Sequence, residues 1–320
     1  MSALDRIVMA EITAGTSVYT VKGLDMSFDV NAEEEQATTA QIRIYNLSEN
    51  IVNDIQQNNS KIVLSAGKET VDVVFQGDIF FCQPIKDATN AVDTEILLDC
   101  FDGGIGYLSA RFSRSYAAGI MVSKIYKDIA ASLGLTLKLD AANVLTAKRL
   151  RASCFDGQAK DVLKNLNREY RVKAKLRDGA LYIGEENAVI NSLARKIPLL
   201  SVDTGLIGLP VVAFERVDNK NYNSVEGDIV LPPGLNAYGE TLKKTIYRKT
   251  ISCTSLLNVD YVVGGQFKLE TEKFTSTFNK DLGKKSKGDA NGIYYIRSIV
   301  HTGGTGVDAG FSTIIEGVPI

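Results

Sequence analysis

The segment GIYYIRSIVHTGGTGVDAGFSTIIEG, from Gly292 to Gly317, decides the fold of this 320-residue chain. Its first part is dense in β-branched and aromatic residues, which fit a pleated, half-buried surface. Neighbours such as Ile293 and Tyr294 fall on opposite faces of an extended chain. A glycine-rich turn at 303–310 follows, and the chain then resumes as a second alternating strand. The segment therefore predicts a β-hairpin with a long polar loop.

A similar segment occurs near the N-terminus, over residues 75–103. In each copy a glycine, Gly77 or Gly292, begins an aromatic strand. The second strand of each copy ends in an acidic residue followed by Gly103 or Gly317. The segments before the two hairpins also match, because each contains a strand, a short connector and a further strand. A repeat of roughly a hundred residues is too long for a solenoid unit, and it indicates a duplicated β domain.

The N-terminal third predicts short strands on either side of the Ala14-Gly15 turn and over 24–30 and 40–45. Short strands at this spacing are typical of a barrel or a sandwich. Either Asn46 or Ser48 is expected to cap the short helix that follows. We interpret the acidic run 33–35 as a solvated loop.

The middle of the chain has a different pattern. Apolar residues recur every three to four positions over 115–134 and 158–170, which predicts two helices. The Asp178-Gly179 pair lies between two alternating runs and predicts a hairpin. We therefore expect a mainly β chain with a small α+β insert. The domains are expected at residues 1–110, 111–200 and 201–320.

The composition excludes several classes of protein. The hydrophobic and charged fractions, 45% and 23%, are those of an ordinary globular protein. The formal net charge of -2 gives no overall attraction to nucleic acid or to an anionic membrane. No apolar run reaches the roughly 18 residues of a membrane span, and the first residues lack the order of a signal peptide. We therefore expect no membrane anchoring, and use in a cytoplasm or release without secretion.

Residues that could carry catalysis or bind a metal are sparse. The single histidine, His301, is interpreted either as a general base or as a hydrogen-bonded turn histidine, and no GxSxG motif accompanies it. Clustered metal ligands and a phosphate-binding motif are both missing from the sequence. We therefore expect no enzyme activity, no cofactor and no metal. Four cysteines without a CxxC pair are interpreted as buried apolar side chains: Cys82, Cys100, Cys154 and Cys253.

Several segments, taken in order, resemble the baseplate hub proteins of contractile-tailed bacteriophages and the related hubs of phage-tail-like bacteriocins. The loop after His301 departs from the family's usual pattern, because Gly304 and 307–309 stand where an acidic residue and another histidine are common. The departure concerns the role of that loop and leaves the fold unaffected. The resemblance rests on residues 42–48, 62–67, 75–79, the Asp102-Gly103 turn with the helix after Tyr116, 252–258, 292–303 and 311–317.

The resemblance implies two tube-like β-barrel domains flanking a small LysM-like α+β domain. It also implies a homotrimer with pseudo-six-fold symmetry, which joins the hexameric tail tube protein to the trimeric central spike protein. Such a hub contacts neighbouring baseplate proteins and surrounds a channel through which DNA passes transiently and without sequence specificity. It belongs to the virion, in the tail baseplate, and is assembled in the bacterial host cytoplasm.

Nine residues are candidates for fold or assembly roles. Ile314 is expected in a paired strand, so that an aspartate there should abolish ring formation. The candidates are Tyr45, Asn46, Gly77, Gly103, Gly292, Tyr294, His301, Ile314 and Gly317.

Two other functions stay open from the sequence. Another tube-like tail assembly protein, such as a distal-tail adaptor or a tube component, would need one barrel and a hexamer. A peptidoglycan-binding or hydrolytic tail module would use residues 111–200 or His301. Against hydrolysis stands the absence of a paired-carboxylate or zinc motif.

Overall fold

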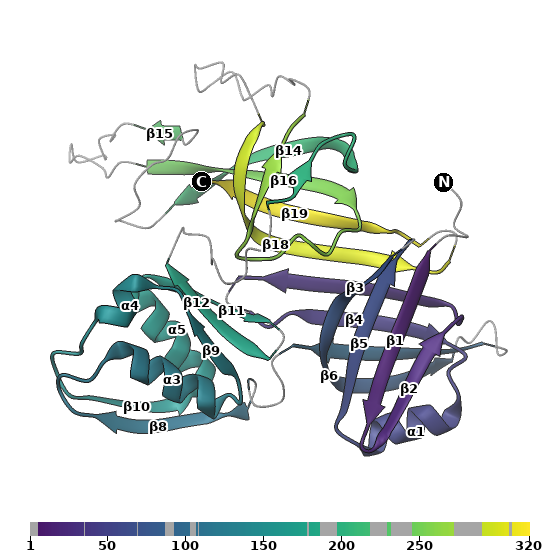
Figure 1. Cartoon of the computed structure of the whole chain (residues 1–320), viewed down its shortest axis with the longest axis horizontal. Helices are drawn as coiled ribbons and strands as arrows, with labels where there is room; N and C mark the ends of the chain where they lie inside the picture. Colours follow the sequence, from purple (N-terminus) through teal and green to yellow (C-terminus); the bar gives the residue numbers. More distant parts are fainter. Residues whose placement is uncertain are drawn as a thin grey trace, which may run out of the picture.

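The computed structural model is mainly β, with one large and largely antiparallel sheet and a smaller α+β unit beside it (Figure 1). The α+β unit lies beside the ends of the strands near the middle of this sheet, where the two β parts of the chain meet (Figure 1). The structure describes residues 6–34, 36–68, 70–86, 93–102, 107, 109–177, 179–185, 197–217, 229–231, 245–271, 290–306 and 309–320.

The first β part contains seven strands and one helix in its described residues. Alternate residues of its strands are buried, as in β3, where Met26, Phe28 and Val30 face a common core. The expected turn at Ala14-Gly15 and the short helix after Asn46 are confirmed. The elements are β1 (Ile7–Ala14), β2 (Ser17–Lys22), β3 (Met26–Glu33), β4 (Thr39–Tyr45), α1 (Glu49–Gln57), β5 (Ser60–Gly67), β6 (Val71–Lys86) and β7 (Thr94–Phe101).

The α+β part buries its own cluster of apolar side chains between helices and two small sheets. The expected helix over 115–134 is shorter, because Ser115 and Tyr116 pair with Cys154 and Ser153 in a strand ladder. Its end is as expected, with Gly134 in a left-handed conformation at φ +73°. The elements are β8 (Arg111–Tyr116), α3 (Val122–Ser132), β9 (Thr136–Leu139), α4 (Ala142–Thr146), β10 (Ser153–Gln158), α5 (Ala159–Tyr170), β11 (Val172–Arg177) and β12 (Ala180–Glu185).

The last part returns to strands around a third buried cluster. The hairpin predicted from the segment 292–317 is confirmed, and its strands pair from Tyr294–Pro319 to Thr302–Ser312. The elements are β13 (Leu199–Leu200), β14 (Leu206–Val217), β15 (Ile229–Leu231), β16 (Thr245–Leu256), β17 (Gln266–Leu269), β18 (Gly292–Gly304) and β19 (Ser312–Pro319).

The strand order of the first β part recurs in the last. In the first part the order is β3-β4-β7-β6-β5, and in the last it is β14-β16-β19-β18-β17. In each order the two hairpin strands, β6 with β7 and β18 with β19, lie next to each other and between the two strands that precede them in the chain. The repeat expected from the sequence is therefore present in the pairing of the strands.

The alignment of the repeat differs from the one suggested by the glycines. Both hairpins contain a register shift, after Ile79 in β6 and after Ile296 in β18. These shifts make Phe80 and Arg297 the equivalent residues, since each is skipped in the pairing. Gly77 therefore corresponds to Tyr294 and not to Gly292, because backbone irregularities fix the register more firmly than isolated glycines.

The expectation of two closed barrels is wrong for the residues that the structure describes. Both β parts belong to one open sheet, in which β3 pairs with β18. In the first part, closure would require β3 to meet β2, the last strand at the opposite end. The edge of β3 is already occupied by β18, and a strand edge accepts only one partner along a given stretch.

Candidate assembly surface

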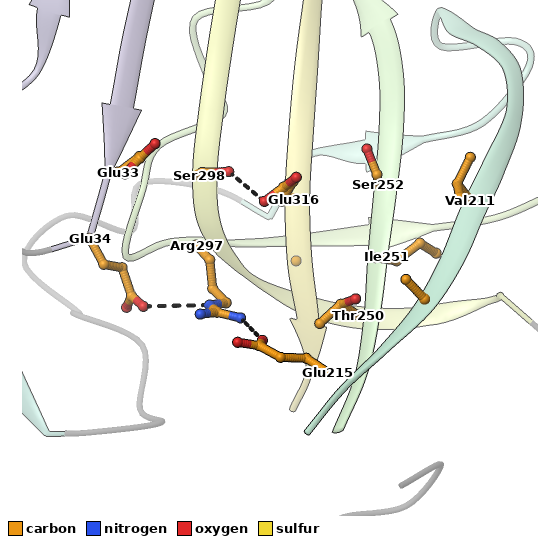
Figure 2. A pocket seen from close by; sticks show the side chains of 12 residues that line it. Glu33, Glu34, Val211, Glu215, Thr250, Ile251, Ser252, Arg297, Ser298 and Glu316 are labelled. Carbon is orange, nitrogen blue, oxygen red and sulfur yellow. Dashed lines mark hydrogen bonds and ion pairs between the residues drawn. The ribbon is translucent and has the colours of Figure 1, made fainter. Parts of the chain in front are cut away.

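One face of the large sheet, called the open face, carries exposed acidic side chains together with exposed apolar ones such as Val211 and Ile314. Five strands contribute to a concave pocket of about 500 Å³ on this face: β14, β16, β19, β18 and β3 (Figure 2). Four carboxylates line the pocket around a single guanidinium group. They belong to Glu33, Glu34, Glu215 and Glu316, and the guanidinium belongs to Arg297.

Arg297 connects the two β parts within this pocket. It is the residue skipped at the β18 shift, and its Nη1 lies 2.6 Å from Oε2 of Glu215 on β14. Its Nε lies 3.9 Å from Oε2 of Glu34, at the end of β3 (Figure 2). Ser298 donates a 3.0 Å hydrogen bond to Glu316 beside it. Carboxylates remain in excess, so the pocket repels anions and offers no site for a phosphate.

The same carboxylate, Glu34, also contacts the α+β part. Lys173 of β11 places its Nζ 3.4 Å from the centre of the Tyr295 ring and 3.8 Å from Oε1 of Glu34. Tyr295 donates a hydrogen bond to Glu34, and burial together with this carboxylate raises the pKa of Tyr295. We call Glu34, Lys173, Tyr295 and Arg297 the Glu34 cluster. It joins all three parts of the chain.

Lys175 makes a second connection from β11 to the end of β3. Its buried Nζ donates to the backbone carbonyl of Glu33 at 3.0 Å and to Oγ1 of Thr38 at 3.3 Å. Burial lowers the pKa of Lys175 to about 8. The interpretation of 33–35 as a solvated loop is therefore wrong at Glu34, while Glu35 lies outside the described residues. A run of acids gives no sign of its distant cationic partners, since Lys173 lies 139 positions after Glu34 and Arg297 lies 263 positions after it.

The candidates Tyr45 and Asn46 mark the end of β4. Tyr45 donates a 3.3 Å hydrogen bond to Glu95, and burial followed by this carboxylate raises its pKa. Asn46 adopts a left-handed conformation at φ 58°, and its side chain contacts Asp93 and the backbone of Thr94. Its expected role as a helix cap is not seen, since the N-cap is Ser48 and no side-chain cap bond is present there.

The candidate glycines lie at places of close packing. A Cβ on Gly77 would come within 2.5 Å of the Phe101 carbonyl oxygen. One on Gly317 would come within 3.0 Å of Phe267. Gly292 is the first residue of β18, whereas Gly103 lies outside the described residues.

The remaining candidates belong to the final hairpin. Tyr294 is buried, stacks on Phe267 and donates a 2.7 Å hydrogen bond to the Ala290 carbonyl. Ile314 lies in a strand paired on both sides, but its side chain is 39% exposed on the open face. We therefore expect an aspartate to disrupt the sheet at the buried neighbour Ile315 and not at Ile314.

His301 lies within β18 and not in a turn. It is buried, opposite Val30 of β3, and its Nδ1 lies 2.9 Å from Oγ1 of Thr313. Burial lowers its pKa to about 4, with a smaller effect from the charge of Arg177. The buried imidazole, with the Thr313 hydroxyl as its hydrogen-bond partner, packs at the junction of the two β parts.

The cysteines and the absent sites complete the description. Cys100 and Cys253 are buried, but Cys154 is exposed and Cys82 is intermediate, so the interpretation as buried apolar side chains is wrong for Cys154. Among the described residues, no group of three or more His, Cys, Asp or Glu side chains could hold a metal ion. None of the helices in that part of the chain is long and apolar enough to cross a membrane.

Proteins of bacteriophage tails share this fold. The tail protein from Neisseria meningitidis MC58 superposes with a TM-score of 0.60 at 11% identity, over 97% of this chain and 96% of that one. The 43 kDa tail protein of prophage MuSo2 from Shewanella oneidensis gives 0.59 at 9% identity, over 98% of both chains. The E. coli c3393 protein, a type VI secretion component similar to T4 tail proteins gp27 and gp5, gives 0.53 at 8% identity, over 92% of this chain and 73% of that one.

The family model for baseplate hub gp41 matches residues 15–218, which is more than half of the chain. The chain therefore belongs to the baseplate hub gp41 family, and it is a structural protein of a bacteriophage tail baseplate. No curated protein matches the sequence. The resemblance to baseplate hubs found in the sequence is confirmed.

Proposed function

We propose that three copies of this chain form the central ring of the baseplate, between the hexameric tail tube and the trimeric central spike. The observation that carries the proposal is the strand order that occurs twice in one chain. Three chains with two such units each present six similar units around an axis. A ring of this kind matches a hexamer on one side and a trimer on the other.

The three parts of the chain have separate roles in this proposal. The domains at 1–110 and 201–320 are the two tube-like units, and the part at 111–200 is a LysM-like flange that contacts neighbouring baseplate proteins. Three distinct buried clusters support this division. Lys173 and Lys175 hold the flange against the sheet, so its orientation is fixed relative to the ring.

The open face of the sheet suits the wall of a channel for DNA. Its acidic side chains are exposed and repel phosphate groups. DNA would pass such a wall without being held, which agrees with a structural role without catalysis. The exposed acidic side chains of this face include Asp29, Glu33, Glu215 and Glu316.

Light scattering of the purified full chain tests the proposal. We expect a mass three times the 34.8 kDa of one chain for the chain alone, or, after addition of the tube and spike proteins, a complex whose mass includes three copies of this chain. A hexamer would favour a tube component. A chain that stays monomeric with both partners present would overturn the proposed function.

A further inference from the structure

The two β parts of one chain meet at a junction that has its own register. β3 pairs antiparallel with the second half of β18, from Glu33 opposite Ser298 to Ser27 opposite Gly304. The first half of β18 pairs with β17 along the same edge, while β19 occupies the other edge. β3 therefore pairs with the part of the β18 edge that the short strand β17 leaves free.

β6 is the counterpart of β18 in the first β part. Its two edges are paired in the same way as those of β18, except that no described strand takes the place of β3. β5 pairs with its first half, Val71 to Asp78, and β7 occupies the other edge from Asp78 to Lys86. From Ile79 onward the first edge has no strand partner among the described residues. Because Phe80 corresponds to Arg297, this free stretch corresponds to the part of β18 that pairs with β3.

β14, the counterpart of β3, lies at the end of the sheet and pairs only with β16 among the described strands. The repeat relates the two strands residue by residue. In the first part Val30 pairs with Ala40, which pairs with Cys100. In the last part Val212 pairs with Ile251, which pairs with Gly317. Cys100 and Gly317 are equivalent, because each is the last residue paired before the register shift in its hairpin. Val212 therefore corresponds to Val30.

We propose that β14 of one copy pairs antiparallel with the free edge of β6 in the next copy, in the register of the β3–β18 junction. The proposal rests on the proposed ring, and the partner that it names is a second copy of this chain. The register places Phe81 opposite Glu215, Gln83 opposite Ala213, and Ile85 opposite Val211. Three such contacts, alternating with three β3–β18 junctions, close a ring of six units.

The side chains at both edges are suited to burial. On β6, Phe80 is 65% exposed and Phe81 is 45% exposed, although both are large and apolar. On β14, Leu209 is 72% exposed and Val211 is 63% exposed. Apolar side chains of this size on two unpaired strand edges indicate surfaces that another protein covers.

Both edges also carry features that prevent indiscriminate pairing. Pro84 on β6 and Pro210 on β14 lack an N–H, so each leaves one ladder bond unmade. Gln56 of α1 donates a 3.1 Å hydrogen bond to the Cys82 carbonyl at the free edge of β6. Since the ladder is incomplete, the side chains must supply the rest of the affinity, and this restricts the edge to a matching partner.

A disulfide between copies tests the register. In the β3–β18 junction the backbone N–H of Glu34 donates to the Arg297 carbonyl, so odd-numbered residues of β18 form the hydrogen-bonded pairs with β3. The even-numbered residues of β18, beginning with Ser298, therefore form the closely spaced pairs that exchange no hydrogen bonds. Gln83 and Ala213 correspond to such a pair, whose Cα atoms lie about 4.5 Å apart, within reach of a disulfide. Both residues are exposed in one copy, so cysteines there leave the fold intact.

The experiment uses the full chain carrying Gln83→Cys and Ala213→Cys, with Cys82 and Cys154 replaced by serine. Mild oxidation should produce covalent dimers and trimers on a non-reducing gel, and a reductant should abolish them. The matched control is Gln83→Cys with Thr250→Cys, because Thr250 lies beside Ala213 but one strand further in. Two strand spacings, about 9.5 Å, are too long for a disulfide.

The outcomes separate this proposal from the proposed function. Cross-linking of the Ala213 pair, with at least tenfold less for the Thr250 pair, supports the register. A trimer by light scattering in which neither pair cross-links, or in which the Thr250 pair cross-links equally, overturns the β6–β14 junction and leaves the trimer standing. A chain that forms no trimer with tube and spike present overturns both.

Discussion

Replacement of Glu34 by glutamine should loosen the attachment of the α+β part to the sheet. Glutamine keeps the shape of the side chain but removes the charge that faces Lys173 and Arg297. Loss of one partner of a fully buried pair costs roughly 3–5 kcal/mol. The Glu34 side chain is 28% exposed, so solvent screens part of the interaction and we expect about 2 kcal/mol.

Hydrogen exchange of backbone amides in β11 and β18 measures this change. A loss of about 2 kcal/mol corresponds to exchange roughly 30-fold faster for amides protected by the contact. Glu33→Gln is the matched control, because Lys175 bonds to the backbone carbonyl of Glu33, which glutamine retains, and the exposed Glu33 side chain accepts a 2.8 Å hydrogen bond from Gln36, which glutamine can also accept. The control should change exchange by less than about twofold. Equal effects of the two substitutions, or none for Glu34→Gln, would refute the role given to the Glu34 cluster.

Three further predictions concern the final hairpin and its counterpart. The pKa of His301 is lowered to about 4 in the folded chain, so the unfolded chain binds more protons than the folded chain between pH 6.5 and 4. The free energy of unfolding should therefore be highest above pH 6.5 and fall as the pH drops through this window. His301→Gln should flatten the dependence of the urea midpoint on pH. Gly77→Val should lower the free energy of unfolding by about 1–3 kcal/mol, because its Cβ would collide with the Phe101 carbonyl; an unchanged urea midpoint would argue against this packing. Ile315→Asp should prevent soluble folding, whereas Ile314→Asp should fold and form the ring at a cost of about 1 kcal/mol; the reverse order in a solubility assay would contradict the assigned faces of β19.

The strands and the repeat could be predicted because they leave local patterns. Alternation located β1, β4 and the final hairpin, and the aromatic strands after Gly77 and near Gly292 revealed two related hairpins. The periodicity of apolar residues likewise located α5 within one residue of its start. These signals come from burial of one face, which every strand or helix carries in its own sequence.

The junctions could not be predicted, because they depend on residues far apart. Pairing of β3 with β18 joins segments about 270 positions apart, and neither strand carries a mark of the other. The same is true of Glu34 and Lys173, whose charges are informative only once they are seen together. Ser115 and Tyr116 were assigned to a helix for a related reason, since their strand exists only through pairing with β10.

The strand spacing indicates a barrel or a sandwich, and the expectation of two tube-like barrels comes from the resemblance. A strand pattern indicates that a sheet exists, but whether it closes depends on which edges meet. Here β3 pairs with β18 of the other β part, so the sheet does not close within one chain and closes only in the proposed ring of three chains. In the proposed ring, assembly depends on the strand edges more than on any single side chain.

Native mass spectrometry of the chain together with its tube and spike proteins tests the central claim most directly. We expect a complex with three copies of this chain, three copies of the spike protein and six copies of the tube protein. Six copies of this chain for each spike trimer would contradict the claim that one chain supplies two of the six units, and so would a complex that contains only one copy.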